Sequence, residues 1–215
     1  MSNKKRTAKL HRKTKETDIK IELNIDGSGK NKIKYPIPFL GHMFQLFSKH
    51  GLFDLKISAS GDLDVDVHHL VEDTGLALGE AFDQALGDRK KIERFGHSIV
   101  PMDESLAEAR VAVDISGRPH LTFEFQFSTQ GWISQPIDIE YGNKKLNYKI
   151  DSDLLSDFFE AFSNKSNISM HIDLIRGKTA HHKIEAIFKA FGVALSKACA
   201  INPRKKGVPS TKGKL

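Results

Sequence analysis

The chain has 215 residues, of which 39% are hydrophobic and 28% are charged, a composition typical of globular domains. No apolar run approaches the roughly 20 residues that cross a bilayer, and the N-terminus lacks the apolar stretch of a signal peptide. The single cysteine, Cys199, cannot form an internal disulfide. We therefore expect a protein of the reducing cytoplasm with no membrane partner, and exclude a disulfide-stapled secreted domain.

The positive charge is concentrated at the two ends of the chain. The net charge is +6, but residues 1–15 carry seven Lys or Arg and residues 204–215 carry five, with no acid in either segment. Residues 16–203 are therefore acidic by six charges. Basic tails often contact anions, whereas a folded nucleic-acid-binding domain usually carries positive charge on its own surface. This distribution argues against a nucleic-acid partner.

The first half of the chain predicts alternating strands and helices. Residues 1–13 have almost no apolar side chains and predict a flexible basic arm. Apolar residues alternate with polar ones from Ile19 to Ile25, which predicts a half-buried strand, and NKIKY is a candidate return strand after a turn. Residues 39–51 predict a helix that ends at Gly51, and residues 52–60 predict a strand. Residues 62–87 predict a short strand that runs into a helix ending at Gly87.

The second half predicts the same order of elements. The segment 111–115 and the alternating run 120–127 predict strands. A helix follows, and its N-cap candidates are Asp151 and Ser152. The remaining elements are a strand, an amphipathic helix and a C-terminal tail, over residues 168–175, 180–198 and 203–215.

The two halves contain an internal repeat. VHHLVEDTGLALG aligns with AHHKIEAIFKAFG, and HMFQLFSKHG aligns with DFFEAFSNKS. The alignment pairs His68 with His181, His69 with His182, Glu72 with Glu185, Gly79 with Gly192, Phe47 with Phe162, and His42 with Asp157. We therefore predict an α+β fold made of two ββαβα-like half-domains, residues 14–92 and 93–202, which lie between the basic arm and the tail.

The repeated HHxxE motif predicts metal binding. In a helix, His68 and Glu72 lie one turn apart on one face, and an imidazole with a carboxylate forms a two-point chelate. The adjacent histidine points about 100° away. The candidate ligands are His42, His68, His69, Glu72, Asp157, His181, His182 and Glu185. Eight ligands provide four for each of two ions, which suits an octahedral divalent ion such as Mn²⁺. His171 competes with Asp157 for its place in this set, although the repeat alignment gives His171 no histidine counterpart.

At this point the residues resemble a known family, the imidazoleglycerol-phosphate dehydratases of histidine biosynthesis. The resemblance covers roughly residues 7–215. It rests on the ordered motifs TKETDIKIELNIDG, FLGHM, HGLFDL, HHLVEDTGLALGEA, RFGHSIVPMDE, DISGRPHL, AHHKIEAIFKAFGVAL and PSTKG. It implies a duplicated α+β fold with helices packed between two sheets. It also implies two Mn²⁺ ions per active site, bound between subunits, and a shell of 24 subunits built from trimers.

The resemblance also implies roles for individual residues. One ion would be shared by His68, Glu72, His182 and Asp157, and the other by His42, His69, His181 and Glu185. Glu16 matches an acid that moves a proton during dehydration of imidazole glycerol phosphate to imidazole acetol phosphate. The residues that match substrate contacts are Glu16, Arg94, Arg118, Lys189, Ser210, Thr211 and Lys212. The tail 203–215 would thus clamp the substrate phosphate, for which Arg, Lys and hydroxyl groups are suitable donors.

Three features depart from the family pattern. Gly41 stands where an acid usually precedes the FLGHM histidine, Asp157 stands where His or Glu is expected, and the stretch between MDE and DISGRP is two residues longer, which a strand bulge would accommodate. Three other functions stay open at this stage. A two-metal phosphate-ester hydrolase would release inorganic phosphate from the substrate. A metal-storage or metal-sensing protein would not need Arg94, Arg118 or Lys212. A nucleic-acid-binding module would bind in a salt-sensitive way and would lose that binding when residues 1–13 are deleted.

Overall fold

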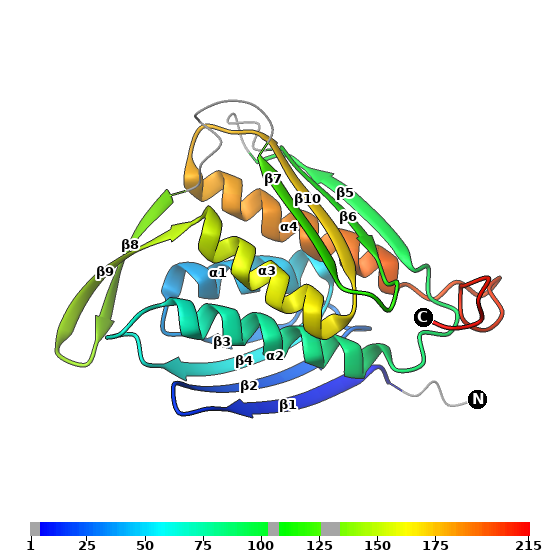
Figure 1. Cartoon of the computed structure of the whole chain (residues 1–215), viewed down its shortest axis with the longest axis horizontal. Coiled ribbons are helices and arrows are strands. Elements are labelled where there is room, and N and C mark those ends of the chain that lie inside the picture. Colours follow the sequence, from blue (N-terminus) through cyan, green and yellow to red (C-terminus); the bar gives the residue numbers. More distant parts are fainter. Residues whose placement is uncertain (1–4, 103–107, 126–133) are drawn as a thin grey trace.

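The computed structural model describes residues 5–102, 108–125 and 134–215 (Figure 1). The first half of the chain forms one four-stranded sheet and two helices. The elements in chain order are β1 (Thr7–Lys13), β2 (Thr17–Asn24), β3 (Asn31–Lys34), α1 (Pro38–Gly51), β4 (Asp54–Gly61) and α2 (His68–Leu86). The strand order is β1-β2-β4-β3, in which β3 runs parallel to β4 and the other pairs are antiparallel.

The second half repeats this arrangement. Its elements are β5 (Phe95–Val100), β6 (Glu108–Asp114), β7 (His120–Phe125), β8 (Ser134–Tyr141), β9 (Lys144–Asp151), α3 (Ser152–Ser166), β10 (Ser169–Arg176) and α4 (Ala180–Cys199). The sheet order is β5-β6-β10-β7, with the same strand directions as in the first sheet. The hairpin β8-β9 is an insertion between β7 and α3. The predicted duplicated α+β fold is therefore confirmed, with one more strand in each main sheet than the ββαβα pattern has and with the hairpin as an addition to the second half.

The four helices lie between the two sheets (Figure 1). Helix α2 packs on the first sheet and α4 on the second, while α1 pairs with α4 and α2 pairs with α3. Aromatic rings fill this layer: Phe47 stacks on Phe191 with ring centroids 4.9 Å apart, and the centroids of Phe44 and Phe158 are 5.6 Å apart. Because rings from both halves share one core, the burial of this apolar surface holds the half-domains together.

Two glycines let the paired helices touch backbone to backbone. A Cβ atom on Gly192 of α4 would lie 2.6 Å from the carbonyl oxygen of Phe47 in α1. A Cβ atom on Gly79 of α2 would lie 2.5 Å from the carbonyl oxygen of Phe162 in α3. Both distances are too short for a real side chain. Since the repeat alignment pairs these same residues, the two contacts confirm it in three dimensions.

The helix ends show which local signals were reliable. Helix α1 ends at Gly51 as predicted, but the residue in the left-handed conformation is the next one, Leu52 (φ 58°). Gly51 instead makes room for packing, because a Cβ there would lie 2.4 Å from the ring of Phe53. Gly87 follows α2 with a φ of 57°, and the side chain of Asp151 caps α3, so both of these signals are confirmed.

Three predicted segments are different in the structure. Residues 7–13 are not a flexible arm but the edge strand β1, which Arg12 ties to α2 through an ion pair of 2.7 Å with Asp73. Strand β3 lies beside β4 and not beside β2, since α1 forms the crossover between two parallel strands. Residues 62–67, predicted to contain a short strand, form turns that lead into α2.

The second sheet contains one irregularity. Residues 103–107, within the stretch predicted to be longer than usual, and the predicted strand end at Phe127 lie outside the described residues. Where β6 pairs with β10, the register shifts between Leu174 and Arg176. The extra residue at this shift lies on β10, because Glu108 and Ala109 of β6 are consecutive. The described part of β6 therefore does not contain the predicted bulge.

The C-terminal end of α4 and the tail lie beside the second sheet (Figure 1). Lys91 donates its backbone N–H to the carbonyl oxygen of Gly207 at 2.8 Å, which fixes the tail's path. Cys199 is buried, and this burial raises the pKa of its thiol to about 12. Within the described ranges, no helix is both long and apolar enough to span a membrane.

Two glycine substitutions should have opposite effects on stability. A Cβ atom on Gly41 would lie 3.5 Å from the Tyr35 side chain, an ordinary contact. Gly41→Ala should therefore raise the apparent Tm by about 2–4 °C, because alanine favours a helix interior by about 1 kcal/mol. Gly79→Ala should lower it, because overpacking costs about 1–3 kcal/mol. Scanning calorimetry at one protein concentration measures both, and shifts of the same sign would contradict the packing described.

The thiol of Cys199 should be inert in the native protein. With a pKa of about 12, only about one thiol in ten thousand is ionised at pH 8, and the thiolate is the reactive form. An aromatic disulfide reagent at pH 8 should therefore give no absorbance change until guanidinium is added, and then release one equivalent per chain. Rapid reaction without denaturant would show that the C-terminal end of α4 opens.

Candidate metal and substrate site

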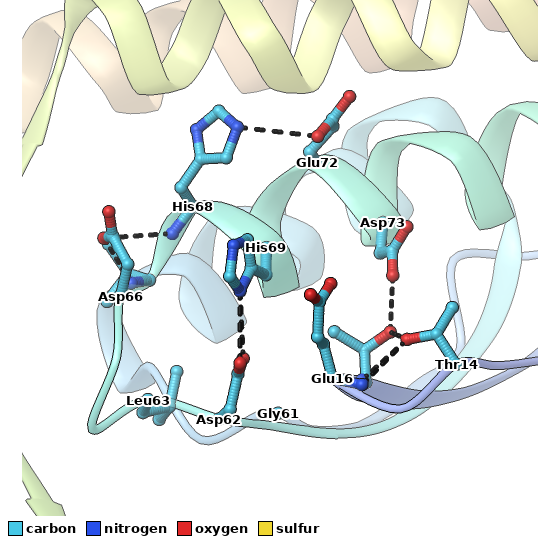
Figure 2. Close-up of polar contacts among 12 residues, drawn as sticks. Thr14, Glu16, Gly61, Asp62, Leu63, Asp66, His68, His69, Glu72 and Asp73 are labelled. Carbon is cyan, nitrogen blue, oxygen red and sulfur yellow. Dashed lines mark hydrogen bonds and ion pairs between the residues drawn. The ribbon is translucent and has the colours of Figure 1, made fainter.

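A first cluster of metal-ligand side chains lies where α2 begins. Asp66 accepts a hydrogen bond of 3.2 Å from the backbone N–H of His68 and so fixes the first turn of the helix (Figure 2). His68 Nε2 lies 3.5 Å from Glu72 Oε2, one helical turn on. The other ring nitrogen, Nδ1, lies 3.2 Å from Asp157 Oδ2 of α3. Three of the four residues predicted for the first ion therefore come together.

A second cluster lies at the start of α4. The side chain of Thr179 caps this helix by accepting from the backbone N–H of His182. Glu185 Oε1 lies 2.8 Å from His181 Nε2 and 3.3 Å from His42 Nε2 of α1. The two imidazoles are half-exposed while Glu185 is buried. Three of the four residues predicted for the second ion also come together.

The two clusters are equivalents under the internal repeat, and their donor atoms fit a divalent ion. Ligand atoms about 2.1 Å from an ion and at right angles to one another lie about 3 Å apart, close to the nitrogen–oxygen contacts of both clusters. In the first cluster, however, Glu72 and Asp157 contact different nitrogens of the His68 ring, so one ion can be shared by His68 and both carboxylates only after a side chain turns. Within the described part of the chain, however, no group of three or more His, Cys, Asp or Glu side chains is arranged to hold an ion by itself.

The fourth predicted ligand of each set is not at its cluster. His69 follows His68 on α2 and turns toward the turn before the helix, where its Nδ1 lies 3.1 Å from Asp62 Oδ2 (Figure 2). The hydrogen bond that His69 donates to the Asp62 carboxylate is the main cause that raises the pKa of His69. Its counterpart His182 likewise follows His181, with ring planes at 89°. The Asp62 contact leaves Nε2 of His69 available to an ion outside its own cluster.

His171 and Asp157 are clearly separated by the structure. Asp157 contacts His68, whereas His171 is exposed on the outer face of the second sheet with its ring 5.5 Å from that of His120. Asp157 is therefore the better candidate for the metal ligand. Although its side chain is shorter than the His or Glu expected there, it reaches His68.

Glu16 occupies the turn between β1 and β2. The Thr14 hydroxyl oxygen accepts from the backbone N–H groups of Glu16 and Thr17, and the Thr17 hydroxyl donates to Asp73 of α2. This network holds the turn against the helix. The carboxylate of Glu16 is exposed, and its charge contributes to raising the pKa of His69 (Figure 2). Glu16 is therefore associated with His69 and not with either three-residue cluster.

Lys189 lies one turn beyond Glu185 on α4. Its Nζ is 3.0 Å from Glu185 Oε2 and 2.9 Å from the sulfur of Met102. Burial alone would raise the pKa of Glu185, but the hydrogen bonds from Lys189 and His181 outweigh it and lower that pKa. Glu185 is therefore held as a carboxylate, the form that binds a cation.

The predicted phosphate contacts lie at the other end of the second half-domain. Arg94 makes a bidentate contact with Asp114 at 2.7 and 3.2 Å, and it donates to the carbonyl oxygen of Pro209 in the tail at 3.0 Å. Arg118 is exposed beside Gly117, against which the chain end at Leu215 packs. Arginines and tail are thus near one another, and the tail residues Ser210, Thr211 and Lys212 belong to the same region.

One chain does not bring the metal clusters and these phosphate contacts together. The backbone N–H of Arg94 bonds to the carbonyl oxygen of Ala198, near the end of α4, whereas His181 is near its start. Seventeen residues of helix at 1.5 Å each separate them by about 25 Å. Asp62 and Asp114, which orient His69 and Arg94, were not identified from the sequence, because only the fold brings these acids to their partners.

Comparison with known proteins gives one consistent answer. The family model described as imidazoleglycerol-phosphate dehydratase matches residues 36–195. The chain is 47% identical to the imidazoleglycerol-phosphate dehydratase of Herminiimonas arsenicoxydans, with 98% of each protein covered, and 46% identical to that of Bacillus licheniformis, with 98% of the chain and 100% of that protein covered.

Solved structures agree with this. A crystal structure of the Pyrococcus furiosus enzyme has a TM-score of 0.73 and 34% identity, over 96% of this chain and 100% of that one. The Staphylococcus aureus enzyme has a TM-score of 0.71 and 35% identity, over 91% and 99%. The duplicated fold, the two equivalent His–Glu clusters and these relatives lead to one conclusion: the chain belongs to the imidazoleglycerol-phosphate dehydratase family.

Proposed function

We propose that the chain dehydrates D-erythro-imidazole glycerol phosphate to imidazole acetol phosphate at active sites that each use two manganese ions. Membership of the family makes the chain a hydro-lyase of histidine biosynthesis. The manganese ions, the residue roles and the assembly are our proposals. The observation that carries them is the pair of equivalent clusters, His68–Glu72–Asp157 and His42–His181–Glu185, in which the imidazole nitrogens lie 2.8–3.5 Å from carboxylate oxygens.

In this proposal each cluster gains its fourth ligand from a neighbouring subunit. His69 would complete the cluster of Glu185, and His182 would complete that of Glu72. Both histidines point away from the cluster on their own helix, as donors to another chain must. Two nitrogen and oxygen ligand sets of this kind suit Mn²⁺. When bound, the ions would act as Lewis acids toward the substrate imidazole.

The remaining residues would bind the substrate and move its protons. Glu16 lies beside His69. If His69 holds an ion, the Glu16 carboxylate would be next to it and would act as the general acid–base. Lys189 would contact the substrate from beside Glu185. Arg94, Arg118 and the tail residues Ser210, Thr211 and Lys212 would hold the phosphate, and so fix the reacting carbons near the ions.

The distances within one chain support sites shared between subunits. About 25 Å separates the phosphate contacts from the start of α4, which exceeds the length of a substrate of this size. This distance supports an active site in which the cluster of Glu185 and the phosphate contacts come from different copies. We propose trimers and a 24-subunit shell as the assembly, a phosphorylated small molecule as the partner, and the cytoplasm as the location, which suits the single buried thiol.

Glu16→Gln should separate binding from chemistry. The variant should keep its metal content and its affinity for substrate, but its kcat should fall by about 10²–10⁴, the usual contribution of a general acid–base. Stopped assays of ketone formation, with metal measured by elemental analysis, test this. Glu140→Gln, an exposed acid on β8, is the matched control and should keep full activity. Near-normal turnover of Glu16→Gln would remove Glu16 from the chemistry.

Removal of the metal should disassemble the protein. Because each ion would join ligands from two chains, stripping with a chelator should convert the assembly to smaller species, and Mn²⁺ should restore both its size and its activity. Light scattering after gel filtration measures the mass directly. An unchanged mass in protein shown to be free of metal would contradict the shared sites.

A further inference from the structure

The outer face of the first sheet carries a group of lysines that the reaction does not use. The four strands of this sheet contain six lysines, whereas the four strands of the second sheet contain none. Side chains alternate along each strand, so residues such as Ile19 and Ile21 are buried against the helices while Lys20 and Glu22 are exposed on the opposite face. The lysines on this outer face are Lys9, Lys13, Lys20, Lys32, Lys34 and Lys56, of which Lys13 is paired with Asp18 at one end of the sheet.

Strand register brings these lysines close together. Lys56 of β4 lies between Glu22 of β2 and Lys32 of β3, and Lys34 is two residues beyond Lys32 on the same face. Glu22 is 3.0 Å from Lys56 and 3.8 Å from Lys9, and Lys56 is the main cause that lowers the pKa of Glu22. Within the described ranges, no carboxylate forms an ion pair with Lys20, Lys32 or Lys34.

The fold itself does not require this group. Like charges on facing positions of neighbouring strands, such as Lys32 and Lys56, destabilise a sheet. Lysines do protect edge strands from pairing with other chains, but Lys20 and Lys56 are on the two central strands, β2 and β4. The second sheet has the same topology and carries none. The lysines therefore need an explanation outside the architecture.

A hollow lies within this group. Its volume is about 360 Å³, and it is lined by Lys20, Glu22, Lys32, Lys34, Lys56, Ile57 and Ser58. We propose that this lysine hollow binds a small oligophosphate anion, of the class of tripolyphosphate or a nucleoside triphosphate. Lysine ammonium groups act as point charges for phosphate oxygens, and alternate residues about 7 Å apart along β3 match a chain of phosphates more than a single one.

The size and composition of the surroundings favour a short ligand over nucleic acid. Acidic residues bound the lysine hollow: Glu22 lines it, and Asp18 and Asp54 occupy the outer face toward either end of the strands. The lining includes no aromatic side chain on which a base could stack. The sequence-based expectation that positive charge lies only in the tails is nevertheless wrong, because the register of four strands concentrates it on a folded surface.

Lysine labelling tests the site directly on the intact holoenzyme. Acetylation rates are measured by mass spectrometry, with and without tripolyphosphate saturated with Mg²⁺, so that the ligand does not strip the enzyme's own metal. Acetylation of Lys32 and Lys34 should slow several-fold, with saturation as the ligand concentration rises. Lys145 and Lys149, exposed lysines of β9, should react at unchanged rates. No protection, or protection that never saturates, would overturn the proposal.

Two matched double variants test the affinity. Lys32→Ala with Lys34→Ala should weaken tripolyphosphate binding at least tenfold in calorimetry, while Lys145→Ala with Lys149→Ala removes the same charge and should leave it unchanged. Both should keep dehydratase activity, since neither pair lies at the proposed active site. Equal losses in the two variants would show unspecific attraction to net charge, and would overturn the proposal.

Two further arms distinguish other sources of the same signal. Arg118→Ala should keep tripolyphosphate binding. If it abolishes binding while the Lys32/Lys34 variant retains it, the ligand occupies the substrate's phosphate site and the lysine hollow is not a site. A 12-nucleotide RNA should protect these lysines no better than tripolyphosphate at equal phosphate concentration. Protection by the RNA alone would replace the proposal with a nucleic-acid surface.

Discussion

The backbone contact of Gly192 with Phe47, and its counterpart of Gly79 with Phe162, sets the positions of the candidate metal ligands. Each glycine lies seven residues, or two helical turns, after the glutamate of its cluster, so both are on one face of the helix. Each phenylalanine lies five residues after the facing ligand, His42 or Asp157. A helix pair pressed together at the glycine therefore brings the facing ligand to the HHxxE motif of its partner helix: His42 contacts Glu185, and Asp157 contacts His68. The duplication provides this arrangement twice.

Much of this could be predicted from the residues, because the information was local or repeated. The turn spacing of His68 and Glu72 needs only helix geometry, and the repeat alignment paired His42 with Asp157 as equivalent positions. The family resemblance implied which metal set each belongs to, and the structure places His42 at Glu185 and Asp157 at His68. Asp157 shows the strength of this argument. Side-chain chemistry alone does not favour Asp157 over His171 as a metal ligand, but the repeat alignment does, because it pairs Asp157 with His42. The structure puts His171 on the outer face of the second sheet.

What the sequence did not predict depends on contacts between distant segments. Strand β1 lacks the apolar content of a core strand and is ordered by its ladder with β2 and by the pairing of Arg12 with Asp73. Asp62 reaches His69 only because residues 62–67 turn instead of extending. The lysines of the first sheet are spread over four strands, and only strand order and register show that they share one face. Counting charge along the chain cannot reveal such a surface.

The central claim is that each ion is held by two chains, since His69 contacts Asp62 instead of its own cluster, and His182 holds the equivalent position on α4, about 100° around the helix from His181. Diffraction from the manganese-loaded protein, recorded at the manganese absorption edge, tests it most directly. The account predicts two anomalous peaks per chain, one at the cluster of Glu72 and one at that of Glu185, each completed by a histidine from a neighbouring copy. Ions held entirely by one chain, or located away from both clusters, would contradict it.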